Sequence, residues 1–212
     1  MFIELVDSLR CLTPHEETWL VASVSRLSGR HIIDGTLGCP ICRRSYPIRA
    51  GVGVFTHDGT VPSLTNPGAA EEDRVMRAAA LLGLTDAGGI IVLGGGWVHC
   101  ADTLAELGPT HVVTLNVAAN DASPQAVSSI VVDDALPFAP GAVRGVALGG
   151  RLAAPTLLSS AVERLRSRGR LVAPAPVPLP DDVTELARDS QDWVAERAVV
   201  ASPPVALKLG RR

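Results

Sequence analysis

The feature that most restricts the fold is an apolar run that ends in three glycines. Residues 88–100 read GGIIVLGGGWVHC, so four apolar residues lead directly into Gly94, Gly95 and Gly96. A continuous apolar run of this length is typical of a strand buried on both faces, as in a parallel sheet. A glycine turn after such a strand lets the backbone approach a ligand closely. The segment therefore predicts an α/β fold, and it raises the question of whether the turn binds a cofactor.

The chain around this segment alternates strand-like and helix-like patterns. We expect strands at 90–93, 111–115, 130–132, 143–148 and 170–173, and helices that begin near Asn66-Pro67 and cover 98–107 and 155–168. Strands separated by helices imply crossover connections and a parallel sheet covered on both faces. The runs DWVAERAVV and PVALKLGRR then predict an antiparallel hairpin that closes the sheet. The expected class is a doubly wound, Rossmann-like α/β sheet.

The first fifty residues have a different character. Residues 18–39 alternate apolar and polar side chains and contain the turn signals Ser28-Gly29 and Asp34-Gly35, which predicts strands joined by hairpins. A β-rich module of about fifty residues needs a staple such as a metal ion. We place this module at 1–57, a linker rich in turn formers at 58–69, and the α/β domain at 70–212.

Cysteine placement favours a metal site in the first module. Three of the four cysteines lie in the first 42 residues, and Cys39 and Cys42 form a CPIC motif. A structural zinc ion needs about four ligands, so we add Cys11 and His15, with His31 in reserve. Thioredoxin-like redox chemistry is the alternative for a lone CxxC. That chemistry requires the motif at a helix start, whereas a strand-like Tyr-Pro-Ile sequence follows here.

The motifs LVDSLRC and LGCPICRRSYPIRAGVGVF resemble the zinc-ribbon family of small methyltransferase-activating proteins. The resemblance covers about residues 3–55 and implies a leading helix, a CPxC and a strand that ends near an apolar GVGVF. The family usually has a second cysteine close to the position of Cys11. This chain has Pro14 there, next to His15.

The second part of the chain resembles the class I S-adenosylmethionine-dependent methyltransferases over about residues 68–210. The stretch VVDDALPF is similar to the family's segment in which an acid, here Asp134, reaches the adenine amino group. SSAVERLRSRGRLVAPAP is similar to its helix, glycine turn and fifth strand. A ribbon directly before such a domain also matches a known domain order.

The resemblance implies that the glycine turn holds S-adenosylmethionine. Gly94 and Gly96 take the family's first two glycine positions, with Gly95 between them. The family's acid falls on Val92, and its third glycine falls on Val98. A valine offers no charge or hydrogen bond, and a branched side chain narrows the space for the ligand. The turn has therefore lost much of the chemistry that the family uses.

Two further positions complete the expected cofactor site. Asn116 stands where the family has an acid that accepts both ribose hydroxyls, and one amide oxygen holds them less well, by about 1–3 kcal/mol. Asp134 is the expected adenine contact. Residues 147–150 read ALGG, so the end of the fourth strand offers no base or nucleophile. We expect no catalytic residue.

Charge and hydropathy restrict the partners. The net charge of −3 gives no overall basic field, so nothing indicates a nucleic-acid partner. The longest apolar run, about 88–98, is far shorter than the roughly 20 residues that cross a bilayer. The N-terminal sequence MFIELVDSLR carries acids where a signal peptide needs a basic start. We expect a cytoplasmic protein.

These observations predict a methyltransferase-like protein that has lost catalysis and acts as a protein-binding scaffold or structural subunit of a larger assembly. One alternative is an active methyltransferase of unknown acceptor. Another is an activator of a separate methyltransferase, acting through an exposed strand edge near Val52 to Phe55.

Overall fold

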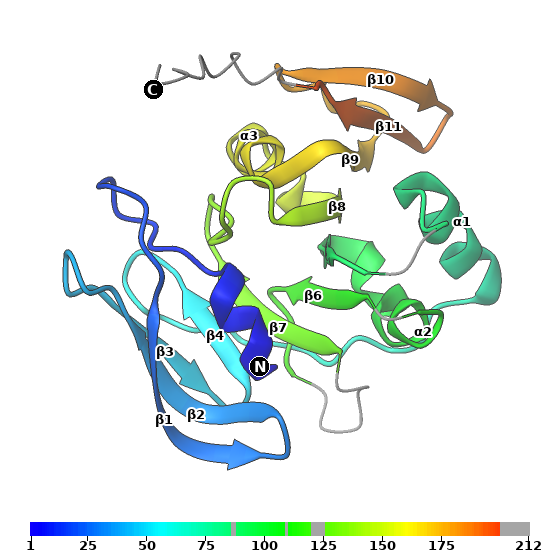
Figure 1. Ribbon diagram of the computed structural model, residues 1–212. Coiled ribbons are helices and arrows are strands. Elements are labelled where there is room, and N and C mark those ends of the chain that lie inside the picture. Colours follow the sequence, from blue (N-terminus) through cyan, green and yellow to red (C-terminus); the bar gives the residue numbers. More distant parts are fainter. Residues whose placement is uncertain (86–87, 109, 120–125, 200–212) are drawn as a thin grey trace, which may run out of the picture.

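One sheet of eleven strands runs through the computed structural model, which describes residues 1–85, 88–108, 110–119 and 126–199 (Figure 1). In chain order the strands are β1 (Val21–Ser28), β2 (His31–Gly38), β3 (Ser45–Arg49), β4 (Val52–Phe55), β5 (Ile90–Leu93), β6 (His111–Leu115), β7 (Val127–Val132), β8 (Val143–Ala147), β9 (Leu165–Pro174), β10 (Val183–Arg188) and β11 (Asp192–Arg197). Their spatial order is β1-β2-β3-β4-β7-β6-β5-β8-β9-β11-β10.

The centre of the sheet is parallel, and both ends are antiparallel. Strands β4, β7, β6, β5, β8 and β9 pair in parallel with their neighbours. The predicted strands 90–93 and 111–115 match β5 and β6, and all of β5 is buried. The predicted α/β class is thereby confirmed, with a β-rich N-terminal part and an antiparallel hairpin at the far end.

Helices cover both faces of the sheet. They are η1 (Ile3–Ser8), α1 (Glu72–Leu82), η2 (Gly95–Cys100), α2 (Ala101–Glu106), η3 (Gly150–Leu152) and α3 (Pro155–Arg164). Helices α1 and α2 share one apolar cluster with the sheet, while α3 and η1 share the other, on the opposite face (Figure 1). The sheet is thus covered by helices on both faces, as a parallel sheet requires.

All three expected helices differ from the prediction at a boundary. The helix expected over 98–107 is the 3-10 helix η2 up to Cys100, and α2 begins only at Ala101. α1 begins at Glu72 rather than near Asn66-Pro67, and Gly68, a poor helix former, follows that proline. α3 ends at Arg164 instead of 168, because Leu165 is extended and starts β9. The first acids of α1, Glu72 and Asp73, still lie in its first turn, where they complement the helix dipole.

The closing hairpin consists of strands β10 and β11. β11 pairs with β9 on one side and with β10 on the other, both antiparallel. The expected run 192–200 supplies β11, whereas the expected second strand, PVALKLGRR, lies outside the described residues. β10 was not predicted, because its residues VTELAR are almost all exposed and show no clear apolar alternation.

The N-terminal strands continue the central sheet. β4 pairs in parallel with β7, with Phe55 opposite Val132, and antiparallel with β3. All four residues of β4 are buried, so the predicted exposed edge near Val52 to Phe55 is wrong: this edge is covered by the chain's own β7. Residues 58–69 form neither helix nor strand, and the division into 1–57 and 70–212 stays a prediction.

One predicted turn is part of a strand. Ser28-Gly29 lies at the β1–β2 hairpin, as expected, but Asp34-Gly35 lies inside β2 opposite a bulge of β1. Gly35 fits there because a Cβ at this position would lie 2.6 Å from the Ser23 carbonyl oxygen. The glycine therefore allows a close approach of two strands and makes no turn.

Candidate functional site

The structure brings Cys11, His15, Cys39 and Cys42 together at one end of the N-terminal strands. Their potential ligand atoms all lie within 4.8 Å of one another. The Cys11 and Cys42 sulfurs are 3.6 Å apart, and Cys39 Sγ lies 3.2 Å from His15 Nε2. This spacing suits a tetrahedral zinc ion at about 2.3 Å from each sulfur and 2.0 Å from the nitrogen. His31, the reserve ligand, instead lies against the ring of Phe2, with 5.7 Å between centroids.

Local hydrogen bonds shape the turn that carries two of these sulfurs. Between β2 and β3, the N–H of Arg43 donates to the Cys39 carbonyl at 3.0 Å, and the N–H of Cys39 donates to the Arg44 carbonyl at 2.9 Å. The Tyr46 hydroxyl fixes the third sulfur, 3.3 Å from Cys11 Sγ. Since the CxxC lies in a turn between two strands, it lacks the helix start that thioredoxin-like chemistry uses.

The cluster favours deprotonated sulfur at two of its three cysteines. Although burial opposes the change, hydrogen bonds from Tyr46 and Thr13 lower the pKa of Cys11. A backbone hydrogen bond from Arg44 lowers the pKa of Cys42 to about 6, and burial raises the pKa of Cys39. Hydrogen bonds to the Glu16 carbonyl and to Cys11 raise the pKa of His15 to about 9. A bound metal ion must displace the His15 proton, because imidazole ligates in its neutral form.

The glycine turn after β5 packs directly against the turn after β8. A Cβ on Gly94 would lie 2.9 Å from the side chains of both Leu148 and Leu152. Gly95 has a φ of 65°, and a Cβ there would lie 2.3 Å from the carbonyl oxygen of Gly149. The glycines therefore accommodate the protein's own chain at this point of the sheet, where the strand order reverses.

The third glycine faces an arginine from α1. A Cβ on Gly96 would lie 2.5 Å from Arg74 Nη2, and the Arg74 guanidinium lies 5.5 Å from the ring centroid of Trp97. Next to them is a cavity of about 590 Å³. Its walls are formed by Glu71, Asp73, Arg74, Arg77, Gly96, Trp97, Gly149, Gly150, Pro174, Gln191 and Asp192.

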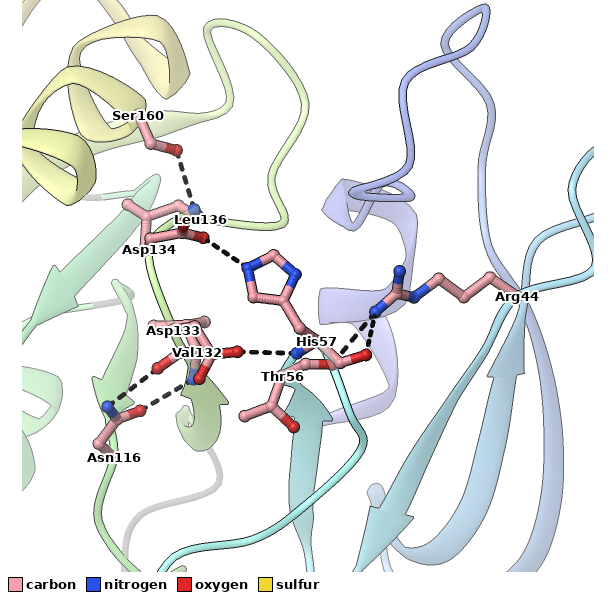
Figure 2. A network of polar contacts seen from close by, with 9 residues as sticks. All are labelled: Arg44, Thr56, His57, Asn116, Val132, Asp133, Asp134, Leu136 and Ser160. Atoms are coloured by element: carbon pink, nitrogen blue, oxygen red, sulfur yellow. Dashed lines mark hydrogen bonds and ion pairs between the residues drawn. The ribbon is translucent and has the colours of Figure 1, made fainter.

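The two polar residues predicted to hold the cofactor each contact the protein itself (Figure 2). The Asn116 amide donates to the Val132 carbonyl at 3.0 Å and accepts from the Val132 N–H at 2.8 Å. Asp134 Oδ1 lies 3.1 Å from His57 Nε2, and the neighbouring Asp133 accepts from the His57 N–H at 2.7 Å. Both side chains have protein partners before any ligand is considered.

The remaining predicted positions are apolar and buried. Val92 is fully buried, and Val98 is 5% exposed. The end of β8 places Leu148 in the core, and neither Gly149 nor Gly150 adds a titratable group. The cavity residues Arg74 and Arg77 were not predicted from the sequence. Their spacing of three residues on an amphipathic helix puts both on one face, and this pattern could have indicated them.

Comparisons with known proteins give weak likenesses only. No family model matches the chain, and no curated protein matches it. Among solved structures, phosphoethanolamine N-methyltransferase 2 from Haemonchus contortus, bound to phosphomonomethylethanolamine and S-adenosylhomocysteine, has a TM-score of 0.41 at 14% identity; the match covers 50% of this chain and 28% of that one. The antibiotic-resistance methyltransferase Kmr has a TM-score of 0.43 at 14% identity, covering 65% of this chain and 98% of that one.

A third neighbour is the 1,6-didemethyltoxoflavin-N1-methyltransferase of Burkholderia thailandensis, with 1,6-didemethyltoxoflavin and S-adenosylhomocysteine bound. It has a TM-score of 0.43 at 12% identity, covering 61% of this chain and 80% of that one. The chain thus spans 28% of the Haemonchus enzyme. At such scores the likeness carries no conclusion about what this chain binds.

A membrane-crossing helix is not found: within the described ranges, every helix is too short or too polar to span a bilayer.

Proposed function

We propose that this protein is a methyltransferase-like subunit with a structural zinc ion. In this proposal the cofactor crevice, the space between the turn after β5 (Gly94 to Gly96) and the turn after β8 (Leu148 to Gly150), is closed by the protein's own chain. The observation that carries the proposal is the filling of the glycine turn. Leu148 and Leu152 contact the position above Gly94, and the backbone of Gly149 lies against Gly95. S-adenosylmethionine has to displace these groups in order to approach the turn at Gly94 and Gly95, whereas Gly96 lines the cavity of about 590 Å³.

The two polar side chains predicted to contact the cofactor support the same proposal. Asn116 is satisfied by both backbone groups of Val132, and Asp134 contacts His57. Breaking a satisfied hydrogen bond to bind a ligand returns little net energy, since one hydrogen bond replaces another. We propose that the chain is therefore not catalytic, and that its task is to bind another protein in the cytoplasm.

The exposed strand β1 supports a protein partner. All eight residues of β1 are exposed, and they include Val21 (62%), Val24 (42%) and Leu27 (51%). Trp19, just before the strand, is 66% exposed. On its outer edge β1 pairs with no strand in the described part of the chain. Apolar side chains beside free backbone groups are a common way to add a partner's strand.

The zinc proposal rests on the four convergent ligands. Three thiolates and one imidazole form a set that structural zinc sites use, and their ligand atoms already lie close enough to share one ion. Native mass spectrometry of the purified protein tests it, with one zinc ion per chain as the expected result. A chain that carries no metal after growth and purification in zinc-containing buffer contradicts it.

Thermal unfolding with added cofactor tests whether the crevice is closed. A ligand at about 100 times its Kd stabilises the native state by about 2.7 kcal/mol. That is about 5–10 °C in Tm for a chain of this size. We expect no shift with millimolar S-adenosylmethionine or S-adenosylhomocysteine, and a saturable shift contradicts the proposal.

A second candidate function is that of an active methyltransferase, favoured by the cavity of about 590 Å³ beside Gly96. Arg74 offers a cation for a carboxylate, and Glu71 and Asp73 offer anions for an amino group, so the cavity suits the amino-acid end of the cofactor. Methyl transfer depends mainly on proximity and alignment, so the lack of a general base does not exclude it. Under this candidate Arg74→Ala abolishes a cofactor-induced Tm shift, whereas Arg151→Ala, outside the cavity, preserves it.

A further inference from the structure

Figure 2 shows a series of polar contacts that runs from Arg44, next to the metal-binding turn, to the carboxyl ends of β7 and β6. It begins at Arg44, two residues after the ligand Cys42. The Arg44 guanidinium donates to the His57 carbonyl at 2.9 Å and to the Thr56 carbonyl at 3.3 Å, and it lies 5.5 Å from the ring centroid of Tyr46. One arginine therefore ties the metal-binding turn to the residues that follow β4.

His57 continues the chain to the end of β7. Its backbone N–H donates to Asp133 Oδ2 at 2.7 Å, and its Nε2 lies 3.1 Å from Asp134 Oδ1. The parallel pairing of β4 with β7 brings these groups together, because Phe55 lies opposite Val132 and both strands end at the same edge. The residues after β4 thus hold the residues after β7 in one position.

The last link reaches β6. The N–H of Val132 donates to Asn116 Oδ1 at 2.8 Å, and the Asn116 amide returns a bond to the Val132 carbonyl at 3.0 Å. Asn116 has a φ of 58°, a left-handed conformation that its side-chain contacts help to hold. The carboxyl ends of three neighbouring strands are therefore linked, through Arg44, to the cluster of Cys11, His15, Cys39 and Cys42.

We propose that metal binding at this cluster sets the conformation of the carboxyl ends of β6 and β7, with Arg44 and His57 as positioning residues. The inference rests on the proposed zinc site. A metal ion fixes the turn that carries Arg44, and an ordered Arg44 fixes Thr56 and His57, which in turn hold Asp133 and Asp134. Loss of the metal from the cluster therefore loosens the carboxyl ends of β6 and β7. The metal-binding turn and these strand ends are thus coupled in free energy.

Two backbone amides report on this coupling directly. The N–H groups of His57 and Val132 donate to side-chain acceptors within the chain of contacts, so their hydrogen exchange by NMR follows its opening. The N–H of Leu148, bonded to the Val172 carbonyl at 3.0 Å on the other side of β5, serves as the reference amide. We expect chelation of zinc from the full-length protein to speed exchange at His57 and Val132 by about tenfold relative to Leu148.

Arg44→Ala separates a coupling role from a merely structural one. In this variant we expect fast exchange at His57 and Val132 both with and without zinc, so that the metal effect disappears. Arg43→Ala is the matched control, because the exposed Arg43 side chain makes no hydrogen bond or ion pair to another described residue. It should retain the full zinc effect.

Zinc content, measured on the same samples, distinguishes the possible failures. If zinc is bound but its removal leaves exchange at His57 and Val132 unchanged relative to Leu148, the coupling is overturned and the zinc site stands. The same holds if Arg44→Ala keeps the zinc effect. If no zinc is bound, both the site and the coupling are overturned.

Discussion

At the scale of single residues, spacing in the sequence predicted which four Cys and His side chains converge, whereas the cofactor contacts of Asn116 and Asp134 stay predictions. Cys39 and Cys42 are close in sequence and lie in one turn. Cys11 and His15 join them because the chain that follows η1 lies next to that turn. The positions of Asn116 and Asp134 at strand ends could also be predicted from the sequence. Their partners, Val132 and His57, could not be predicted, because the residues that lie next to a strand end depend on which strands pair.

Replacing one ligand should remove the metal. We expect Cys42→Ala to lower zinc content from one ion per chain to none and to lower the Tm, because the remaining three ligands leave the tetrahedron incomplete. Mass spectrometry and thermal unfolding check both effects. Cys100→Ala is the control, since Cys100 is fully buried between α2 and the sheet and lies outside the cluster. Full zinc content in Cys42→Ala contradicts the assignment.

The glycine turn should tolerate no side chain at its second position. Gly95→Ala adds a Cβ within 2.3 Å of the Gly149 carbonyl at a φ of 65°, so we expect a loss of at least about 2 kcal/mol in the free energy of unfolding. Gly68→Ala, where a Cβ meets nothing within 4 Å, should change it by less than about 0.5 kcal/mol. Urea unfolding measures both variants. Equal stability of the two would show that the turns after β5 and β8 are not in contact.

At the scale of elements, periodicity predicted the buried strands and the strands within 18–39, but it failed for the exposed strand β10. β5 (IIVL) is a continuous apolar run and β6 (HVVTL) is mostly apolar, and their predicted bounds coincide with the observed ones. β10 carries no such signal, because the sheet leaves it exposed, and its place is fixed by pairing with β11. The ends of α1 and α3 depended on local backbone geometry that an apolar pattern does not report.

The β10–β11 turn is tied to α1 by charge. Backbone N–H groups of Asp192 and Gln191, and then Arg77, lower the pKa of Asp189 to about 2. A carboxyl with a folded pKa below its unfolded value near 4 stabilises the protein above about pH 4 and loses this contribution as the pH falls through 2. We therefore expect Asp189→Asn to lower the Tm at pH 7 and to match the wild type near pH 2.

The control for this variant is Asp181→Asn, which removes the same charge from an exposed residue before β10. Its side chain makes no hydrogen bond to any described residue. It should leave the Tm unchanged at both pH values. An Asp189→Asn penalty that is as large at pH 2 as at pH 7 would assign the effect to packing instead of charge.

At the scale of the whole molecule, the N-terminal module is part of the central sheet. Leu9 bridges to Phe138, β4 pairs with β7, and Tyr46 lies in the same apolar cluster as Val132. The sequence indicated two modules and a linker but gave no sign of this pairing, because strand order depends on contacts far apart in the chain. The exposed edge expected at Val52 to Phe55 was wrong for the same reason.

A chain that starts at residue 58 should therefore not fold alone. Removing 1–57 uncovers the edge of β7 and the apolar face beneath η1, and exposed strand edges of this kind aggregate. We expect the 58–212 fragment to be insoluble, and co-expression with a separate 1–57 chain to restore its solubility. A soluble 58–212 fragment with cooperative unfolding by circular dichroism would contradict this.

The central claim, that the space between the turns after β5 and β8 is closed to S-adenosylmethionine, is tested most directly by calorimetric titration of the protein, purified in zinc-containing buffer, with S-adenosylmethionine. The filling of the space above Gly94 by Leu148 and Leu152 predicts no binding heat at millimolar cofactor from a folded sample. Saturable one-to-one binding at micromolar strength, lost in Arg74→Ala, would contradict the claim and identify the cavity beside Gly96 as a working cofactor site.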